Sequence, residues 1–346
     1  LRACGACVRR NMGETTRCDG GGGRATRSLI EGTVLRHFGK PDPKGLQDHA
    51  ELSPPSGHRI AFTTDSFVVQ PLFFPGGDIG KLAINGTVND LAVSGAIPQV
   101  LSCGLILEEG LELSVLEQVI ASMATAATEA QVQIVTGDIK VVEKGAADQL
   151  FINTAGIGFL PENRSIASWR AEAGDAVLVS HFLGDHGAAI VDARGELSLQ
   201  IPVESDCQPL NSLIAEMLTV CSQIHCLRDA TRGGIATVLN EFAQDSGVCI
   251  HLWEQQIPVR EVVQGVCEIL GLDPLYLANE GTLVAVVPAD QAEIVLSTMC
   301  THPAGRHSCQ IGVVSESPKG RVILQTTFGG ERVVDVLYGE QLPRIC

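Results

Sequence analysis

Apolar residues recur at helical spacing directly after the turn at 75–77. The positions that follow Asp78 share one face of a helix: Ile79, Ala83 and Gly86. We therefore predict a helix that begins after Asp78, with the Asp78 carboxylate accepting from the first free amides as the N-cap. Asp90 falls on the same stripe. Because a carboxylate that faces a protein interior is costly unless a cation meets it, Asp90 is either a functional residue or a solvated residue near the helix end.

The other periodic stretches alternate between strands and helices. Ser114 and Glu117 predict a capping box at the start of a second helix, whose apolar face runs from Leu116 to Ala130. Further helices are expected to begin near Ala188 and to cover 210–221 and 235–242. Strands are predicted at 59–64, 100–107, 132–135, 149–160, 175–180 and 282–287. This mixture predicts an α/β (α+β) fold.

The chain of 346 residues is long enough for two domains. The turn at 161–164 is the expected boundary, which gives an N-terminal domain at 19–160 and a C-terminal domain at 161–336. Residues 1–18 form a basic leader that we expect to be disordered. Residues 337–346 are too short and too interrupted to hold a fold, so we expect a mobile tail that carries the thiol of Cys346.

The overall charge narrows the class of ligand. A formal net charge of −16 argues against a nucleic-acid groove and favours magnesium-dependent or protein partners. The longest apolar runs are the size of strands, so we expect no membrane span. The twelve cysteines are scattered, and Cys4 and Cys7 lack a second pair for zinc. We therefore expect reduced thiols and a cytoplasmic protein.

Five carboxylates stand at predicted turns or strand ends, and two lysines lie close to them in sequence. A single Asp in such a place is usually a turn former or a helix cap, but several together can hold Mg²⁺ with substrate phosphates. A nucleoside triphosphate is the ligand that such a set favours. The carboxylates are Asp65, Asp90, Asp138, Asp229 and Glu280, and the lysines are Lys81 and Lys140.

Several motifs resemble those of the HypE family, the carbamoyl dehydratases of nickel-iron hydrogenase maturation. The Asn-Asp-Leu and Gly-Asp segments are shared with the wider PurM-like (AIR synthase-like) ATP-binding superfamily, whereas the terminal Pro-Arg-Ile-Cys is specific to HypE. The resemblance runs from about Asp19 to the last residue. It rests on the segments at 64–69, 71–83, 85–91, 136–138, 140–142, 184–187, 228–234, 279–281 and 343–346.

The resemblance implies a homodimer of two-domain PurM-like chains whose N-terminal domains pair through a β-barrel, with ATP and Mg²⁺ near the interface. It also implies that Cys346 receives a carbamoyl group from HypF. ATP then drives dehydration of this group to a thiocyanate, and the cyanide passes to iron on HypC and HypD. A mobile thiol suits a carrier that visits several enzymes.

The resemblance and the chemistry of phosphoryl transfer assign roles to the candidate residues. Mg²⁺ and protein groups position the reactants and neutralise charge in such a transfer. The amide must also lose two protons, which requires a base. The expected roles are Mg²⁺–ATP ligation by Asp65, Asp90 and Asp138, nucleotide or phosphate binding by Lys81, Asn85 and Asp229, and base catalysis on the Cys346 group by Glu280 or Lys140.

Three positions depart from the family pattern. The segment 19–23 stands where His-Gly-Ser-Gly-Gly is usual; it predicts a flexible loop, either over phosphates or as a plain linker. Ile139 and His181 replace the usual Thr and Gly. Two alternatives stay open: another PurM-like ATP enzyme such as a selenophosphate synthetase, and a non-catalytic nucleotide-binding thiol carrier.

Overall fold

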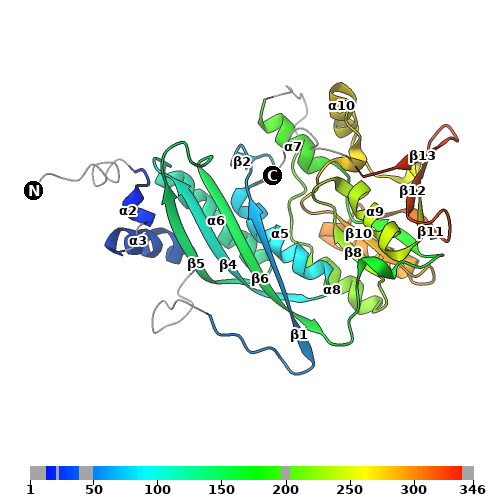
Figure 1. Cartoon of the computed structure of the whole chain (residues 1–346), viewed down its shortest axis with the longest axis horizontal. Coiled ribbons are helices and arrows are strands. Elements are labelled where there is room, and N and C mark those ends of the chain that lie inside the picture. Colours follow the sequence, from blue (N-terminus) through cyan, green and yellow to red (C-terminus); the bar gives the residue numbers. More distant parts are fainter. Residues whose placement is uncertain (1–12, 21–22, 39–49, 196–202, 337–346) are drawn as a thin grey trace, which may run out of the picture.

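The computed structural model of the chain describes residues 13–20, 23–38, 50–195 and 203–336. Two β-sheets with their own helices lie one after the other along the long axis of the molecule (Figure 1). The first sheet has four strands and the second has seven. The mixed α/β architecture predicted from the sequence is confirmed.

The N-terminal sheet has the strand order β1-β6-β4-β5. The pair β4 and β5 is parallel, and the other neighbours are antiparallel. A short ribbon of β2 and β3 leads into α5. The elements are α2 (Arg17–Gly20), α3 (Gly23–Leu29), the π-helix η1 (Ile30–Val34), α4 (Leu35–Phe38), β1 (His58–Phe67), β2 (Phe73–Phe74), β3 (Gly77–Asp78), α5 (Ile79–Val93), β4 (Ile97–Glu108), α6 (Leu113–Glu129), β5 (Gln133–Val142) and β6 (Leu150–Pro161).

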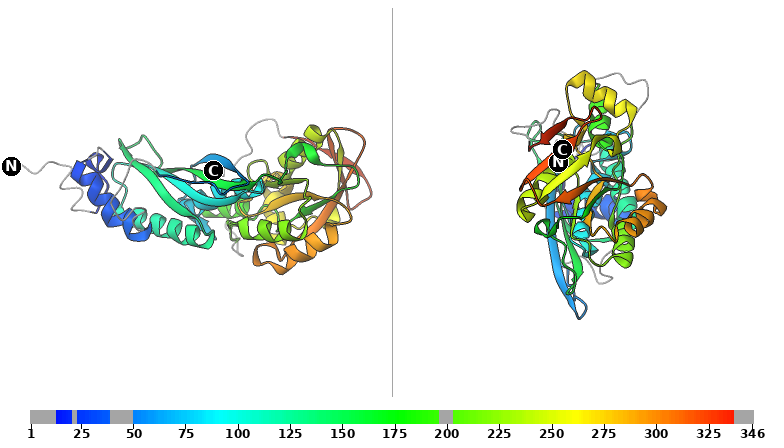
Figure 2. Two further views of the ribbon diagram at one scale, coloured as in Figure 1. Left: turned by 90° about the horizontal axis from the view of Figure 1, so that it is seen from below. Right: turned by 90° about the vertical axis from the view of Figure 1, so that its right-hand side faces the viewer.

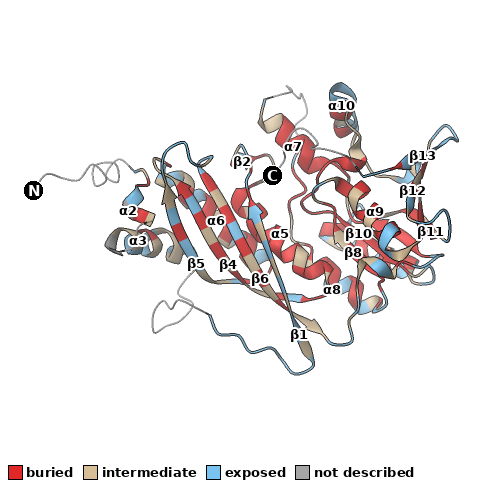
Figure 3. Ribbon diagram, in the orientation of Figure 1, coloured by how far each residue is buried: buried red, intermediate tan, exposed pale blue. Residues whose placement is uncertain are grey.

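The helices α5 and α6 cover one face of this sheet (Figure 2). Strand residues that point to these helices, such as Leu101 and Leu107 of β4, are buried in the core. On the opposite face, Ile60 and Phe62 of β1 are 55% and 67% exposed. The alternating burial along the strands is visible in Figure 3. This sheet therefore presents an apolar face that no described element covers.

The C-terminal sheet has the order β13-β12-β9-β11-β7-β10-β8, antiparallel throughout except for β12 and β9. Its strands are β7 (Ala176–Val179), β8 (Cys226–Asp229), β9 (Cys249–Trp253), β10 (Leu283–Val287), β11 (Cys309–Ser315), β12 (Arg321–Gln325) and β13 (Glu331–Val334). Its helices are α7 (Asp185–Ala193), α8 (Asn211–Val220), α9 (Gly234–Ser246), α10 (Glu261–Leu270) and α11 (Ala292–Thr301), with 3₁₀ turns η2 (Ser168–Arg170), η3 (Glu254–Gln256), η4 (Pro274–Tyr276) and η5 (Pro303–Gly305).

Helices pack on both faces of the central strands of this second sheet. α9 lies against one face, and α8 and α11 lie against the other. Every residue of β7 and β10 is consequently buried. This double cover explains why both strands are unbroken apolar runs in the sequence.

The helix α5 joins the two halves of the molecule. Residues along most of its length lie in the core of the N-terminal sheet, whereas Ala92 and Val93 at its end pack with α8 and α11. The predicted N-cap is confirmed, since the Asp78 carboxylate accepts from the amides of Gly80 at 2.7 Å and Lys81 at 3.1 Å. α5 is thus the natural place for a site between the halves.

Three local predictions were wrong. Ser114 does not cap α6, because the N-cap is Glu112 and the Ser114 hydroxyl donates to the Glu112 carboxylate instead. Asp19 and Gly20 belong to α2, and Gly23 and Arg24 belong to α3, rather than to the predicted loop at 19–24, whereas Gly21 and Gly22 lie outside the described residues. Asp65 and Asp138 lie inside strands rather than at strand ends, because β1 continues to Phe67 and β5 continues to Val142.

Candidate functional site

The end of α5 places Asp90 against β1. The Thr63 hydroxyl of β1 donates to the Asp90 carboxylate at 2.9 Å. Asp65, two residues further along β1, points to the same face of the sheet. A Cβ on Gly86 would come within 2.9 Å of the Phe67 ring and 4.0 Å of an Asp65 oxygen, so the glycine permits this close approach of helix and strand.

Asp229 reaches the same place from the C-terminal sheet. It is the last residue of β8 and is buried. Burial raises its pKa to about 7, and the negative charges of Asp90 and Asp65 add to this effect. Burial likewise raises the pKa of Asp90, with Asp65 contributing in the same direction. Three of the predicted carboxylates therefore lie close enough to repel one another.

Glu280 completes this group from the turn before β10. The turn is held beside Asp229, because the Asn279 amide donates to the Ala230 carbonyl at 3.0 Å and Ala230 donates to Thr282 at 2.8 Å. Burial raises the pKa of Glu280 well above its usual value, and the charges of Asp206, Asp229 and Asp65 raise it further. We call Asp65, Asp90, Asp229 and Glu280 the carboxylate cluster.

Positive charge reaches the cluster from one loop of the C-terminal domain. Arg228 lies in β8 and Arg232 in the turn between β8 and α9, and the charge of Arg232 opposes the rise in the pKa values of both Asp90 and Glu280. Arg232 is exposed, so its guanidinium is free to approach a phosphate. Lys81, by contrast, is half-buried, and its ammonium donates to the Gly76 carbonyl at 3.1 Å.

Two predicted residues lie elsewhere in the chain. Asp138 and Lys140 form an ion pair of 2.7 Å on β5, and both side chains are largely exposed. In register, Asp138 aligns with Gly104, Asn153 and Ser66, whereas Asp65 aligns with Thr154. Asp138 therefore points to the uncovered face, three strands or roughly 14 Å from β1. Within one chain, Asp138 and Lys140 do not join the carboxylate cluster.

Asn85 is fully buried one turn before Asn89. Its side-chain amide donates to the Cys207 sulfur at 3.6 Å, and its carbonyl oxygen has no hydrogen-bond partner among the described residues. Burial raises the pKa of the Cys207 thiol, and the neighbouring Glu280 charge adds to the effect. Asn85 and Cys207 thus form the buried floor beside Glu280.

The cluster fits a divalent cation only in combination with phosphates. Within the described ranges, no three His, Cys, Asp or Glu side chains are arranged to hold a metal ion by themselves. The mutual repulsion of Asp65, Asp90 and Asp229 is nonetheless what a bound cation would relieve. Mg²⁺ characteristically uses one or two carboxylates and takes its other ligands from phosphates and water.

Sequence reasoning missed several residues of this site. Thr63 and Arg232 lie in segments that were recognised, but nothing in the sequence showed what they contact. Asp206 and Cys207 fall between two predicted elements, where Asp is usually a turn former. Cys346, Cys4 and Cys7 lie outside the described residues.

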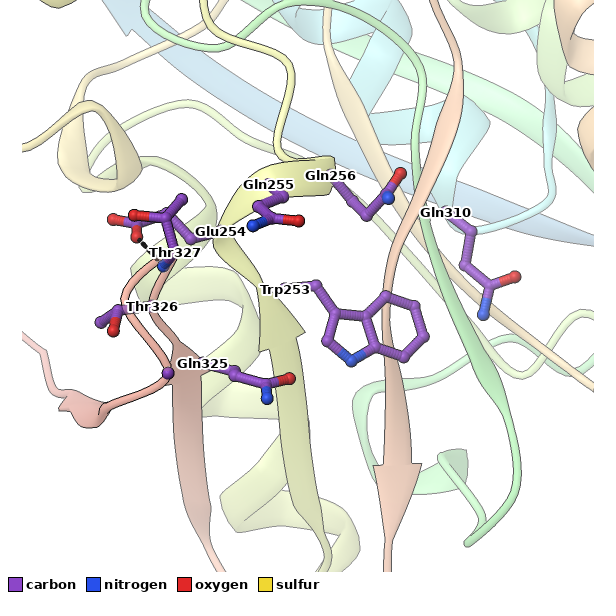
Figure 4. A pocket seen from close by; sticks show the side chains of 9 residues that line it. Trp253, Glu254, Gln255, Gln256, Gln310, Gln325, Thr326 and Thr327 are labelled. Carbon is purple, nitrogen blue, oxygen red and sulfur yellow. Dashed lines mark hydrogen bonds between the residues drawn. The ribbon is translucent and has the colours of Figure 1, made fainter.

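A polar hollow in the C-terminal domain is separate from the cluster. It lies at the ends of β9 and β12 and is lined by Trp253 and several glutamines, including Gln255 and Gln325 (Figure 4). None of the predicted site residues lines it. The chemistry expected of the chain therefore belongs to the cluster at the end of α5.

Family models place the chain in a class of proteins defined by this architecture. Residues 46–160 match the N-terminal domain of AIR synthase related proteins, and residues 172–325 match their C-terminal domain. The chain is 50% identical to the carbamoyl dehydratase HypE of Rhodobacter capsulatus over 335 aligned residues. The alignment covers 96% of this chain and 98% of the relative. The chain belongs to the HypE family of carbamoyl dehydratases.

Solved structures agree with this assignment. The hydrogenase maturation protein HypE in complex with ATP has a TM-score of 0.91 and 48% identity, over 95% of this chain and 99% of that one. A chain of a solved HypE–HypF complex matches with a TM-score of 0.78 and 47% identity, over 90% of this chain and all of that one. The resemblance read from the sequence motifs is confirmed. No helix of the described residues is long and apolar enough to cross a membrane.

Proposed function

We propose that this protein is an ATP-dependent carbamoyl dehydratase that converts a carbamoyl group on its own Cys346 into a thiocyanate. The observation that carries the proposal is the convergence of Asp65, Asp90, Asp229 and Glu280 at the end of α5, in a chain that belongs to the HypE family. The solved HypE structure with ATP supports nucleotide binding here.

The reaction requires an amide oxygen to leave. ATP transfers its γ-phosphoryl group to that oxygen, which turns it into a phosphate leaving group. The nitrogen gives up two protons, the carbon–oxygen bond breaks, and a carbon–nitrogen triple bond remains on the Cys346 sulfur. The products are the S-cyano cysteine, ADP and phosphate.

The cluster residues take distinct parts in this reaction. Asp65 and Asp90 would be the protein ligands of Mg²⁺, and the Arg232 guanidinium stabilises the charge of the transferred phosphoryl group. Asp229 adds nucleotide binding at the back of the site. When bound, the metal ion neutralises the phosphate oxygens and orients them. Glu280 is the base, because a raised pKa brings a carboxyl group towards the range where it accepts a proton near neutral pH.

Asp138 and Lys140 fit this scheme through a second copy of the chain. We infer that the uncovered face of the N-terminal sheet pairs with the same face of a partner, which closes a β-barrel and covers the apolar side chains of β1. Asp138 and Lys140 then lie at the interface, where Asp138 would be a ligand of the nucleotide-bound metal and Lys140 a base or a cation that contacts phosphate. Lys81 and Asn85 support the site from α5.

The tail at 337–346 carries the group between proteins. The solved HypE–HypF complex supports a HypF-type carbamoyltransferase as the source of the carbamoyl group. HypC- and HypD-type proteins are the proposed acceptors, where cyanide becomes a ligand of hydrogenase iron. In this scheme Cys346 would meet the carbamoyl donor, the carboxylate cluster and the cyanide acceptor in turn.

The mass of the Cys346 peptide tests the proposal. The protein is incubated with HypF, carbamoyl phosphate and ATP, and the peptide is expected to gain a carbamoyl group and then to lose the mass of one water only when Mg²⁺ and ATP are present. Normal carbamoylation without this ATP-dependent loss would show a thiol carrier instead. Absence of any modification at Cys346 would point to another ATP enzyme of the superfamily.

A further inference from the structure

One short segment touches both halves of the proposed site. Residues 203–210 lie between α7 and α8 and reach the N-terminal domain through four hydrogen bonds, of which the contact between Asn85 and Cys207 is described above. The Ser205 amide donates to the Pro75 carbonyl at 2.8 Å. Asn89, the neighbour of Asp90 on α5, donates to the Gln208 carbonyl at 3.1 Å and accepts from the Leu210 amide at 2.8 Å. We call residues 203–210 the strap.

The strap also forms hydrogen bonds with the turn that carries Glu280. The buried Asp206 carboxylate accepts from the Glu280 amide at 2.9 Å, from the Gly281 amide at 3.0 Å and from the Thr282 hydroxyl at 2.8 Å. The Gln208 side chain donates to the Gly281 carbonyl at 2.9 Å. Four bonds therefore join two residues of the strap to three consecutive residues of the turn.

The contact is too close to allow a side chain at Gly281. A Cβ there would lie 1.9 Å from the Asp206 carbonyl oxygen. The strap and the turn therefore meet backbone to backbone, and the turn has little freedom to shift unless Asp206 releases it. Removing the carboxylate would leave two amides without their acceptor in a buried place.

We propose that Asp206 is a positioning residue, which fixes the Glu280 turn against α5 so that Glu280 and Asp90 act on one substrate. This inference rests on the proposed function, because it gives Glu280 its role in the reaction. Reacting groups must be held to a fraction of an ångström, and a misplacement of 1 Å can cost about 100-fold in rate. Asp206 acts only through the turn and does not touch the substrate.

The variants D206N and D206A test this role in the full-length protein with HypF. An Asn keeps the size of the side chain but presents an NH₂ group to donors, so some of the hydrogen bonds to the Glu280 turn are lost. An Ala loses all the hydrogen bonds that the carboxylate accepts. We expect carbamoylation of Cys346 to stay normal and the KM for ATP to change less than about threefold. The kcat of dehydration should fall about 10-fold in D206N and about 100-fold in D206A.

D175N is the matched control. Asp175 is also a buried carboxylate of the C-terminal domain, and it accepts from the Glu172 amide at 2.8 Å and pairs with His225 at 2.7 Å, away from the Glu280 turn. D175N should lose stability without losing kcat. If D206N and D175N have the same kcat, Asp206 is merely structural and the proposal is wrong.

Hydrogen exchange separates this inference from the proposed function. In D206N, the amides of Glu280 and Gly281 should exchange at least about 10-fold faster, whereas they should stay protected in D175N and T282V, which keep the carboxylate. Unchanged protection in D206N would overturn the inference. If the wild type shows no dehydration at all, the proposed function fails, while the exchange result still decides whether Asp206 holds the turn.

Discussion

Asp229 is buried beside two other carboxylates, and its pKa is about 7 instead of the usual 3.8. Ionising this group costs more in the folded state than in the unfolded state, so the stability that it contributes is complete below pH 4 and is lost as the pH rises to about 7. The loss is up to about 4 kcal/mol for three pKa units.

D229N removes this titration. Without nucleotide or Mg²⁺, the wild type should lose stability relative to D229N between pH 4 and pH 8, as measured by urea unfolding at each pH. A bound cation would offset the carboxylate charge. Mg²⁺ with ATP should therefore reduce the difference in the free energy of unfolding between D229N and the wild type at pH 8. A constant difference between the two proteins at every pH would contradict the pKa assigned to Asp229.

At the scale of residues, the sequence indicated which side chains are candidates for the chemistry better than it indicated which residues they contact. Asp90 could be found because it shares a stripe with the apolar residues of its helix. Asp206 could not, because its role depends on backbone amides of residues 280 and 281, which are distant in sequence. Asp138 was recognised by its motif, but the face of the sheet to which its side chain points depends on the register of β5 against β4.

The helix α5 depends on its close approach to β1. G86A would push a methyl group to within 2.9 Å of the Phe67 ring, and overpacking of this kind costs about 1–3 kcal/mol. The higher helix propensity of Ala returns at most about 1 kcal/mol. We expect a net loss of about 1–2 kcal/mol and a weaker affinity for ATP.

Gly265 in α10 provides the control for this substitution. A Cβ there meets no atom within 4 Å, so G265A should stabilise the protein by up to about 1 kcal/mol. Chemical denaturation measures both variants. Equal effects of the two substitutions would show that propensity, rather than packing of α5 on β1, decides the outcome.

The start of α5 is fixed by a single cap. D78A removes the acceptor for two helix amides and for the Ser122 hydroxyl, which donates at 2.5 Å, so it should cost about 1–2 kcal/mol. S114A should change stability by less than about 0.5 kcal/mol, because Ser114 caps nothing. A large loss of stability in S114A would instead support the capping box that the sequence predicted.

Elements were predictable where one pattern dominates. The fully buried strands β7 and β10 and the helix α5 carry strong apolar signals. The capping box at Ser114 failed because Glu112 is already the N-cap of α6, which begins at Leu113. The loop predicted at 19–24 failed at its described residues, because they belong to α2 and α3. Propensity was overridden by tertiary contacts in the latter case.

At the scale of the molecule, the uncovered apolar sheet predicts a dimer. F62D places a charge in the centre of that face and should weaken self-association at least about 30-fold, as measured by light scattering across a dilution series. F328D is the control, since Phe328 is 97% exposed at a turn of the other domain. A dimer that survives F62D unchanged would exclude this face as the interface.

The division into two sheets could be predicted from apolar runs and turns, but their joint site could not. It arises where α5 leaves one core and enters the other, and where β8 and the Glu280 turn arrive from a second sheet. Local patterns in the sequence do not show which distant segments meet in this way.

The central claim is that the carboxylate cluster performs dehydration of a group carried by Cys346. E280Q keeps the size and burial of the side chain but removes the base, while E293Q alters an exposed glutamate on α11. The deciding measurement is the mass of the Cys346 peptide after HypF, carbamoyl phosphate and Mg²⁺–ATP. We predict full carbamoylation in both variants, loss of water in E293Q at the wild-type rate, and a rate at least about 100-fold lower in E280Q. Loss of water in E280Q at the wild-type rate would contradict the account.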